Sequence, residues 1–157
     1  MPHLIGLISD THGLLRADVH TTLKGVELIL HAGDVGGDEI IAELELIAPV
    51  RAVAGNCDMP YVGGLVPALD LTLDGISIHV SHGHELGVPK PAALLASYSA
   101  DVIVYGHTHR PLVERHGARL VVNPGAAGPR RFNLRPSVGR LTLSENSVKV
   151  EIVELDA

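Results

Sequence analysis

Apolar and polar positions occur in blocks along the chain, and the first blocks predict strands joined by helices. Short aliphatic runs at 5–9, 26–30 and 50–54 have the length of buried strands. Between the first two, Leu15, Val19 and Leu23 recur at the spacing of one helix face, which predicts a helix over 14–25 that stops at Gly25. Residues 38–47 predict a second helix, opened by two acids and followed by Pro49. This alternation indicates parallel β-α-β units.

The later part of the chain predicts antiparallel pairs and one more helix. Apolar runs at 69–73 and 76–81 flank Asp74-Gly75, a two-residue hairpin signal. Residues 89–99 predict a short helix with Pro91 near its start, and 101–106 predict another buried strand. Two further hairpins are expected to turn at His116-Gly117 and at Glu145-Asn146. No repeat or linker interrupts the pattern, so we expect one α/β domain with mixed sheets over residues 1–157.

Composition narrows the classes of function. The formal charge of −6, the absence of Trp and the presence of one Phe and three Tyr disfavour a nucleic-acid polymer as substrate, because such polymers need basic tracks and stacking rings. Without a charge block, a basic amino-terminal region or a long apolar run, the chain is expected to be cytoplasmic and to have no membrane contact. Its single cysteine, Cys57, excludes an intramolecular disulfide and is typical of a reducing compartment.

Five predicted strands each lead into a polar cluster that contains or borders glycine: SDTHG, HAGD, GNCD, SHGH and GHTH. In open α/β sheets, sites form outside the carboxyl ends of strands, where such side chains converge. Carboxylate, amide and imidazole groups suit manganese, iron, zinc or a similar divalent ion. Seven such groups exceed one tetrahedral shell, so two ions that share a carboxylate are favoured, the arrangement used to cleave phosphoesters. The seven are Asp10, His12, Asp34, Asn56, His82, His107 and His109.

Taken singly, these residues have ordinary structural interpretations. Asp10 and Asp34 would serve as helix caps, and Asn56 would fit a turn. Considered in isolation, two histidines such as His107 and His109 would be a surface feature at a strand end. Metal ligation is favoured because it explains all five clusters together.

The ordered series D-x-H, GD, GN, H and GHxH, with NPGA at 123–126, resembles the calcineurin-like metallophosphoesterases. The short length resembles their small bacterial and archaeal phosphodiesterase branch, which includes the retromer vacuolar sorting subunit. The match covers 10–125 and implies a four-layer αββα sandwich of two mixed β-sheets flanked by helices. It also implies a metal-dependent phosphodiesterase or phosphatase whose nucleophile is a hydroxide bridging two ions. The expected ion is Mn²⁺, with Ni²⁺, Co²⁺, Fe²⁺ or Zn²⁺ as alternatives.

The resemblance distributes the ligands between two metals. It assigns Asp10, His12 and His109 to one ion and Asn56, His82 and His107 to the other, with Asp34 bridging both and Asn56 also close to the substrate phosphate. Many relatives carry histidine directly after the motif asparagine, to protonate the leaving group, whereas this chain carries Cys57. Esters with good leaving groups are therefore expected to react best, and His84 is the candidate replacement acid.

Other site residues follow from charge and position. Arg110, Arg130, Arg131 and Arg135 would grip a phosphate or form a solvated basic loop, and His31 would orient Asp34 or simply pack. Substrate choice is expected in loops 59–65 and 128–135. We expect a small phosphodiester or phosphomonoester substrate, with a non-catalytic metal-binding scaffold and a nuclease as alternatives. The natural substrate, the metal and the oligomeric state, including a homo-oligomer, stay open.

Overall fold

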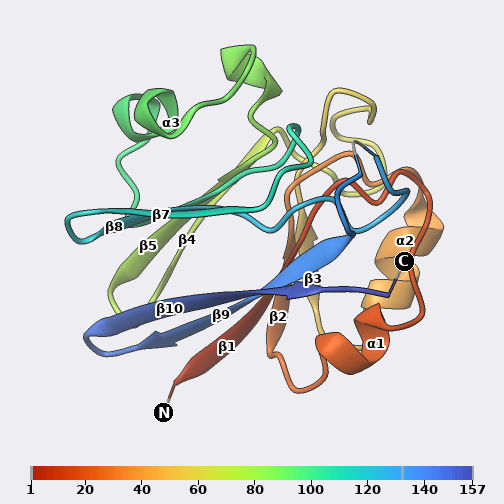
Figure 1. The fold of residues 1–157 in the computed structure, drawn as a ribbon, viewed down its shortest axis with the longest axis horizontal. Helices are drawn as coiled ribbons and strands as arrows, with labels where there is room; N and C mark the ends of the chain where they lie inside the picture. The colour runs from red at the N-terminus through yellow and green to blue at the C-terminus, as the bar shows by residue number, and fades with distance from the viewer. Residues whose placement is uncertain (1, 132, 157) are drawn as a thin grey trace.

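Two five-stranded mixed sheets form the molecule in the computed structural model, which describes residues 2–131 and 133–156 (Figure 1). The first sheet has the order β10 (Ser147–Glu154), β9 (Ser137–Ser144), β1 (His3–Ile8), β2 (Leu28–His31), β3 (Val50–Ala52). The second has the order β4 (Ala68–Leu73), β5 (Ile76–Ser81), β6 (Val102–Val104), β8 (Arg119–Asn123), β7 (Leu112–His116).

Three apolar clusters lie between four layers, which confirms the expected αββα sandwich. One cluster joins inward residues of both sheets, with Ile5 and Leu30 from the first and Val80 and Val104 from the second. A second cluster packs the outer face of the first sheet against α1 (Val19–Thr22) and α2 (Asp38–Leu44). A third packs α3 (Pro91–Ser97) on the outer face of the second sheet, largely through the fully buried Leu94.

The three predicted hairpins are confirmed. β4 pairs with β5 across Asp74-Gly75, β7 pairs with β8 across His116-Gly117, and β9 pairs with β10 across Glu145-Asn146, each antiparallel. Asp74 adopts a φ of 50° and Gly75 a φ of 76°, the left-handed values that a tight hairpin requires.

The helices are shorter than the pattern predicted. The predicted helix over 14–25 is wrong in its first part, because α1 begins only at Val19. Arg16 lies outside the helix, and its Nε donates a hydrogen bond to the carbonyl of Gly128, 3.0 Å away, so this segment is held by a tertiary contact. The predicted helix over 38–47 ends as α2 at Leu44, and the helix predicted over 89–99 is α3, which begins at Pro91.

Parallel pairing within each sheet brings the carboxyl ends of six strands to one end of the sandwich. β1, β2 and β3 run parallel in the first sheet, and β5, β6 and β8 run parallel in the second. All five polar clusters follow carboxyl ends of these strands, so the two sheets direct them to the same end of the sandwich. None of the described helices is both long and apolar enough to span a bilayer.

Candidate metal centre

Asp10 begins the site at the end of β1, and its two carboxylate oxygens have different surroundings. Oδ2 accepts a hydrogen bond from Ser9 Oγ at 2.7 Å and from the His107 amide at 3.2 Å. Oδ1 is fully buried and accepts no hydrogen bond from any residue that the structure describes. It lies 3.3 Å from His109 Nε2 and 3.7 Å from His12 Nε2. Asp10, His12 and His109, which the sequence assigned to one ion, therefore place ligand atoms within 4.8 Å of one another.

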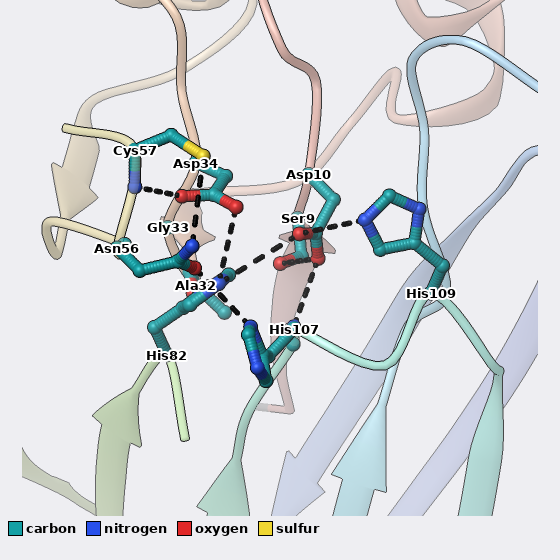
Figure 2. A network of polar contacts seen from close by, with 12 residues as sticks. Ser9, Asp10, Ala32, Gly33, Asp34, Asn56, Cys57, His82, His107 and His109 are labelled. Carbon is teal, nitrogen blue, oxygen red and sulfur yellow. Dashed lines mark hydrogen bonds and ion pairs between the residues drawn. The ribbon is translucent and has the colours of Figure 1, made fainter. Parts of the chain in front are cut away.

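His82 is held in the form that can bind a metal. Its Nδ1 lies 2.8 Å from the Ala32 carbonyl, and a carbonyl can only accept, so the proton is on Nδ1. In the neutral imidazole the lone pair is then on Nε2, which is buried and has no hydrogen-bond partner within the described part of the chain. Nε2 faces Asp34 Oδ2 at 3.3 Å and Asp10 Oδ1 at 3.9 Å (Figure 2). Metal-binding histidines are commonly oriented by such a carbonyl contact.

Asp34 lies between the two groups. Its Oδ1 accepts a hydrogen bond from the Cys57 amide at 2.8 Å, and its Oδ2 lies close to His82 (Figure 2). Oδ2 also lies 3.6 Å from His12 Nε2. Asp34 therefore presents one oxygen toward ligand atoms from both sheets, as a bridging carboxylate must.

Asn56 and His107 form the outer side of the site. His107 Nδ1 lies 3.2 Å from Asn56 Oδ1, and the ring centroids of His107 and His82 are 5.1 Å apart. The residues that the sequence assigned to a second ion are thus neighbours. Cys57 forms a further group of candidate ligands with His12 and Asp34, because the ligand atoms of these three residues lie within 4.8 Å of one another. Burial and the nearby Asp34 raise the pKa of this thiol, which keeps it protonated and a poor ligand at neutral pH.

The two carboxylates stay ionised despite their burial. Burial alone would raise the pKa of Asp10, but the nearby imidazoles of His109 and His12 outweigh it, and the pKa falls below its ordinary value. Burial likewise opposes ionisation of Asp34, but contacts with His82 and the Cys57 amide lower its pKa. The site therefore concentrates negative charge where a cation would bind.

Left-handed backbone conformations occur at five of the seven candidate ligands. Values of φ between 47° and 69° are found at Asp10, His12, Asp34, His107 and His109. Such conformations are costly for residues other than glycine, and they concentrate at functional sites where the surrounding structure enforces them. The sequence gives no direct signal for them, although the neighbouring glycines indicate sharp turns.

Buried polar side chains fix the loops that carry the ligands. The Gly33 amide donates to His31 Nδ1 at 3.1 Å, so the proton of this fully buried imidazole is on Nε2, which lies 3.0 Å from Thr11 Oγ1. His31 thus orients the backbone before Asp34 and not its carboxylate. Thr11 Oγ1 in turn donates to the Val35 carbonyl at 2.7 Å, which joins the first two loops.

Asp58 and Asn123 perform similar tasks that sequence reasoning missed. Asp58 accepts hydrogen bonds from the amides of Val35, Gly36 and Gly55 at 2.9 to 3.2 Å, which ties the Asp34 loop to the Asn56 loop. Asn123 Nδ2 donates to the Gly106 carbonyl and to Thr108 Oγ1, both at 3.1 Å. The NPGA motif therefore braces the loop that carries His107 and His109.

The candidate acid and the arginines lie at the rim. The ring centroid of His84, an exposed residue, lies 5.4 Å from that of His82 and 6.3 Å from that of His107. Arg131 is exposed, and its charge acts on the Cys57 thiol, which places it on the same side as Asp34. Arg110 and Arg130 are also exposed. Arg135 pairs with Glu154 at 3.4 Å, so it belongs to a solvated surface. The expected substrate loop 128–135 includes residue 132, which lies outside the described residues.

Two hollows flank the loop between Asn56 and Leu65. One, of about 330 Å³, is lined mainly by this loop and by the segment from Val35 to Ile41. The other, of about 250 Å³, lies toward the second sheet and contains His84 in its wall. The predicted substrate loop 59–65 thus lines a cavity on each side.

Comparison with known proteins identifies relatives over almost the whole chain. The model of the calcineurin-like phosphoesterase superfamily domain matches residues 4–146. A probable metallophosphoesterase of Methanothermobacter thermautotrophicus is 36% identical over 163 residues, covering 98% of this chain and 94% of the relative. A phosphodiesterase of Methanocaldococcus jannaschii is 31% identical, over an alignment that covers 77% of this chain and 82% of the relative. The crystal structure of wild-type Vps29 from Entamoeba histolytica complexed with Zn²⁺ aligns with a TM-score of 0.73 at 26% identity, covering 96% and 98% of the two chains.

Proposed function

The chain belongs to the calcineurin-like phosphoesterase superfamily, and we propose that it is a phosphodiesterase that hydrolyses small phosphoesters with two divalent metal ions. One observation carries the proposal. Asp10 Oδ1 and His82 Nε2 are buried without a hydrogen-bond partner among the described residues, and they lie 3.9 Å apart. Burying unpaired acceptors is costly, so their retention around an anionic centre is best explained by a cation that binds them.

The ligand set fits two ions. We assign Asp10, His12 and His109 to one ion and Asn56, His82 and His107 to the other, with Asp34 shared. Oxygen and imidazole donors suit Mn²⁺, and also Fe²⁺, Co²⁺, Ni²⁺ and Zn²⁺. The zinc complex of the Vps29 relative supports the last of these.

The residues of the chain have distinct tasks in this proposal. A pair of divalent ions, when bound, supplies an activated water and positive charge for the phosphate oxygens. Asp34 holds the two halves in register, while Asn56 and the exposed Arg110, Arg130 and Arg131 contact the phosphate. His84 donates the proton to the departing alkoxide, because Cys57 stands next to Asn56 and its raised pKa makes it a weak acid.

A non-catalytic metal-binding scaffold is the second candidate, because the Vps29 structures share the fold. A scaffold need not keep all seven candidate ligands, including both His107 and His109, as this chain does. A nuclease shares the chemistry, but the net charge of −6 opposes binding of a long polyanion.

Turnover of bis(p-nitrophenyl) phosphate tests the proposal. Protein loaded with Mn²⁺ is expected to release nitrophenol, and a chelator, Asp34→Asn or His107→Ala is expected to abolish this. Absence of turnover with Mn²⁺, Ni²⁺, Co²⁺ and Zn²⁺, in protein that binds two ions, would establish the scaffold instead.

A further inference from the structure

The hollow on the side of the second sheet adjoins the candidate metal centre through three residues. Gly55 precedes Asn56, Ser81 precedes His82, and His84 contributes its own side chain. In Figure 1 the loop after β3 and the turn η1 (His84–Leu86) rise together at the upper end of the molecule. An ester whose phosphate lies at the metal centre can therefore place one substituent directly in this hollow.

The walls favour a flat apolar group. They include the side chains of Ala54, Pro60, Pro67 and Ala68 and the ring of Tyr98. Tyr98 is held in place, because it stacks on His79 with ring centroids 3.8 Å apart. The volume of about 250 Å³ lies below the range of about 300–1,000 Å³ typical of drug-sized ligands, so a single ring system fits and a longer chain does not.

The polar groups in the wall are acceptors. Glu85 accepts hydrogen bonds from the Tyr98 hydroxyl at 2.7 Å and from the Gly83 amide at 3.0 Å, both neutral donors. Within residues 2–131 and 133–156 it forms no ion pair, so its charge is not neutralised. A carboxylate has about four acceptor positions, which leaves some for a ligand. Ser81 belongs to the same wall, but the residue is only 1% exposed and its Oγ is buried, so Glu85 is the acceptor that a ligand can reach.

Resting on the function proposed above, we propose that this hollow binds the organic group of the ester, a compact planar ring that carries an N–H donor. The donor would meet the Glu85 carboxylate, while the ring lies between the prolines and Tyr98. This position also places the bond to the leaving oxygen beside His84, since His84 lies between the hollow and the metal ligands.

The other hollow is less suited to this task. Its lining includes Met59, Val62 and Leu65, and its two carboxylates are Asp38 and Asp58. Asp58 already accepts three backbone amides. Most of the acceptor positions of Asp58 are thus occupied by backbone amides of the metal-centre loops, which leaves fewer for a ligand than Glu85 has.

Binding of paired phosphonates tests the inference without requiring turnover. Aminobenzyl phosphonates, as the 3- and 4-isomers, and the corresponding methylbenzyl phosphonates have nearly equal size but differ in one N–H donor. Calorimetry on the Mn²⁺-loaded protein is expected to show at least one amino isomer binding about tenfold more tightly than its methyl partner, as a hydrogen bond to a charged group predicts. Glu85→Gln is expected to reduce this ratio.

The matched control is Glu43→Gln, which removes one negative charge from α2 and should leave the ratio unchanged. Equal affinities of the amino and methyl compounds, or no binding of either, would overturn the inference. A preserved preference in Glu85→Gln would do the same. Hydrolysis of bis(p-nitrophenyl) phosphate is measured separately: selective binding without hydrolysis refutes the proposed function alone, and hydrolysis without selective binding refutes the hollow alone.

Discussion

Gly55→Ala is a small change that should disable the metal centre. A β-carbon at Gly55 would lie 2.2 Å from Asp34 Oδ1, 2.3 Å from the Asp34 amide nitrogen and 2.8 Å from Asp34 Cγ. Ordinary contacts of this kind begin near 3.4 Å. Rotation of the Asp34 side chain cannot relieve the overlap, because the backbone nitrogen is equally close. The two loops must therefore separate.

The required separation, about 1 Å, is large compared with the ±0.2 Å tolerance of metal–ligand distances. It would also stretch the hydrogen bond from the Cys57 amide to Asp34 Oδ1, now 2.8 Å long. A misplacement of about 1 Å in a catalytic site costs about 100-fold in rate. We expect a loss of at least that size in kcat for bis(p-nitrophenyl) phosphate, together with loss of bound Mn²⁺.

The assay combines steady-state kinetics with metal analysis, and Gly6→Ala is the control. A β-carbon at Gly6 would approach side-chain carbons of Leu23, at 3.2 Å, and of Ile29, at 3.4 Å, within the core under α1. This variant is expected to lose some stability but to keep its metal content and kcat. If Gly55→Ala bound two Mn²⁺ ions and turned over like the parent protein, the position of Asp34 described above would be refuted.

Three further predictions concern histidines. His107→Ala and His109→Ala should each lower the Mn²⁺ content from two ions to one. Anomalous scattering should show the remaining ion beside Asp10 in His107→Ala and beside His82 in His109→Ala, and the same remaining ion in both variants would contradict the assignment. Burial lowers the pKa of His31 to about 4 from 6.5, so unfolding takes up a proton between these two pH values. Metal-free protein, prepared with a chelator, should therefore lose about 3 kcal/mol of its free energy of unfolding as the pH falls from 6.5 to 4. Urea unfolding should show a smaller loss of stability with falling pH in His31→Gln, and the same pH dependence in variant and parent would refute the role of His31. His84→Asn should slow phenyl esters about 100-fold while p-nitrophenyl esters change little, and equal slowing of both would exclude His84 as the proton donor.

Much of the fold was predictable because hydrophobic periodicity and turn residues are local signals. The three hairpins turn where Asp74-Gly75, His116-Gly117 and Glu145-Asn146 predicted, and the parallel strands end at the polar clusters. The convergence of the seven side chains follows from parallel pairing, which carries strand ends to one edge whatever lies between them.

The errors lie where tertiary contacts override local preference. The start of α1 was placed too early because the contact of Arg16 with the Gly128 carbonyl joins residues more than a hundred positions apart. Asp58 and Asn123 were missed as loop braces for the same reason, since their partners lie in loops remote in sequence. His31, which was expected either to orient Asp34 or simply to pack, accepts a hydrogen bond from the amide of Gly33.

The pair His107 and His109 shows how such remote contacts define the site. Both residues adopt left-handed backbone conformations, with φ of 69° and 63°. As Figure 2 shows, His107 lies beside Asn56 whereas His109 lies beside Asp10. The intervening Thr108 accepts the hydrogen bond from Asn123 Nδ2, so the backbone between the histidines is held from β8. An H-x-H segment alone would be free to chelate one ion with both rings. In this fold each ring has a different set of neighbours, so the loss of Asn123, which holds the loop through Gly106 and Thr108, should weaken the binding of both metals.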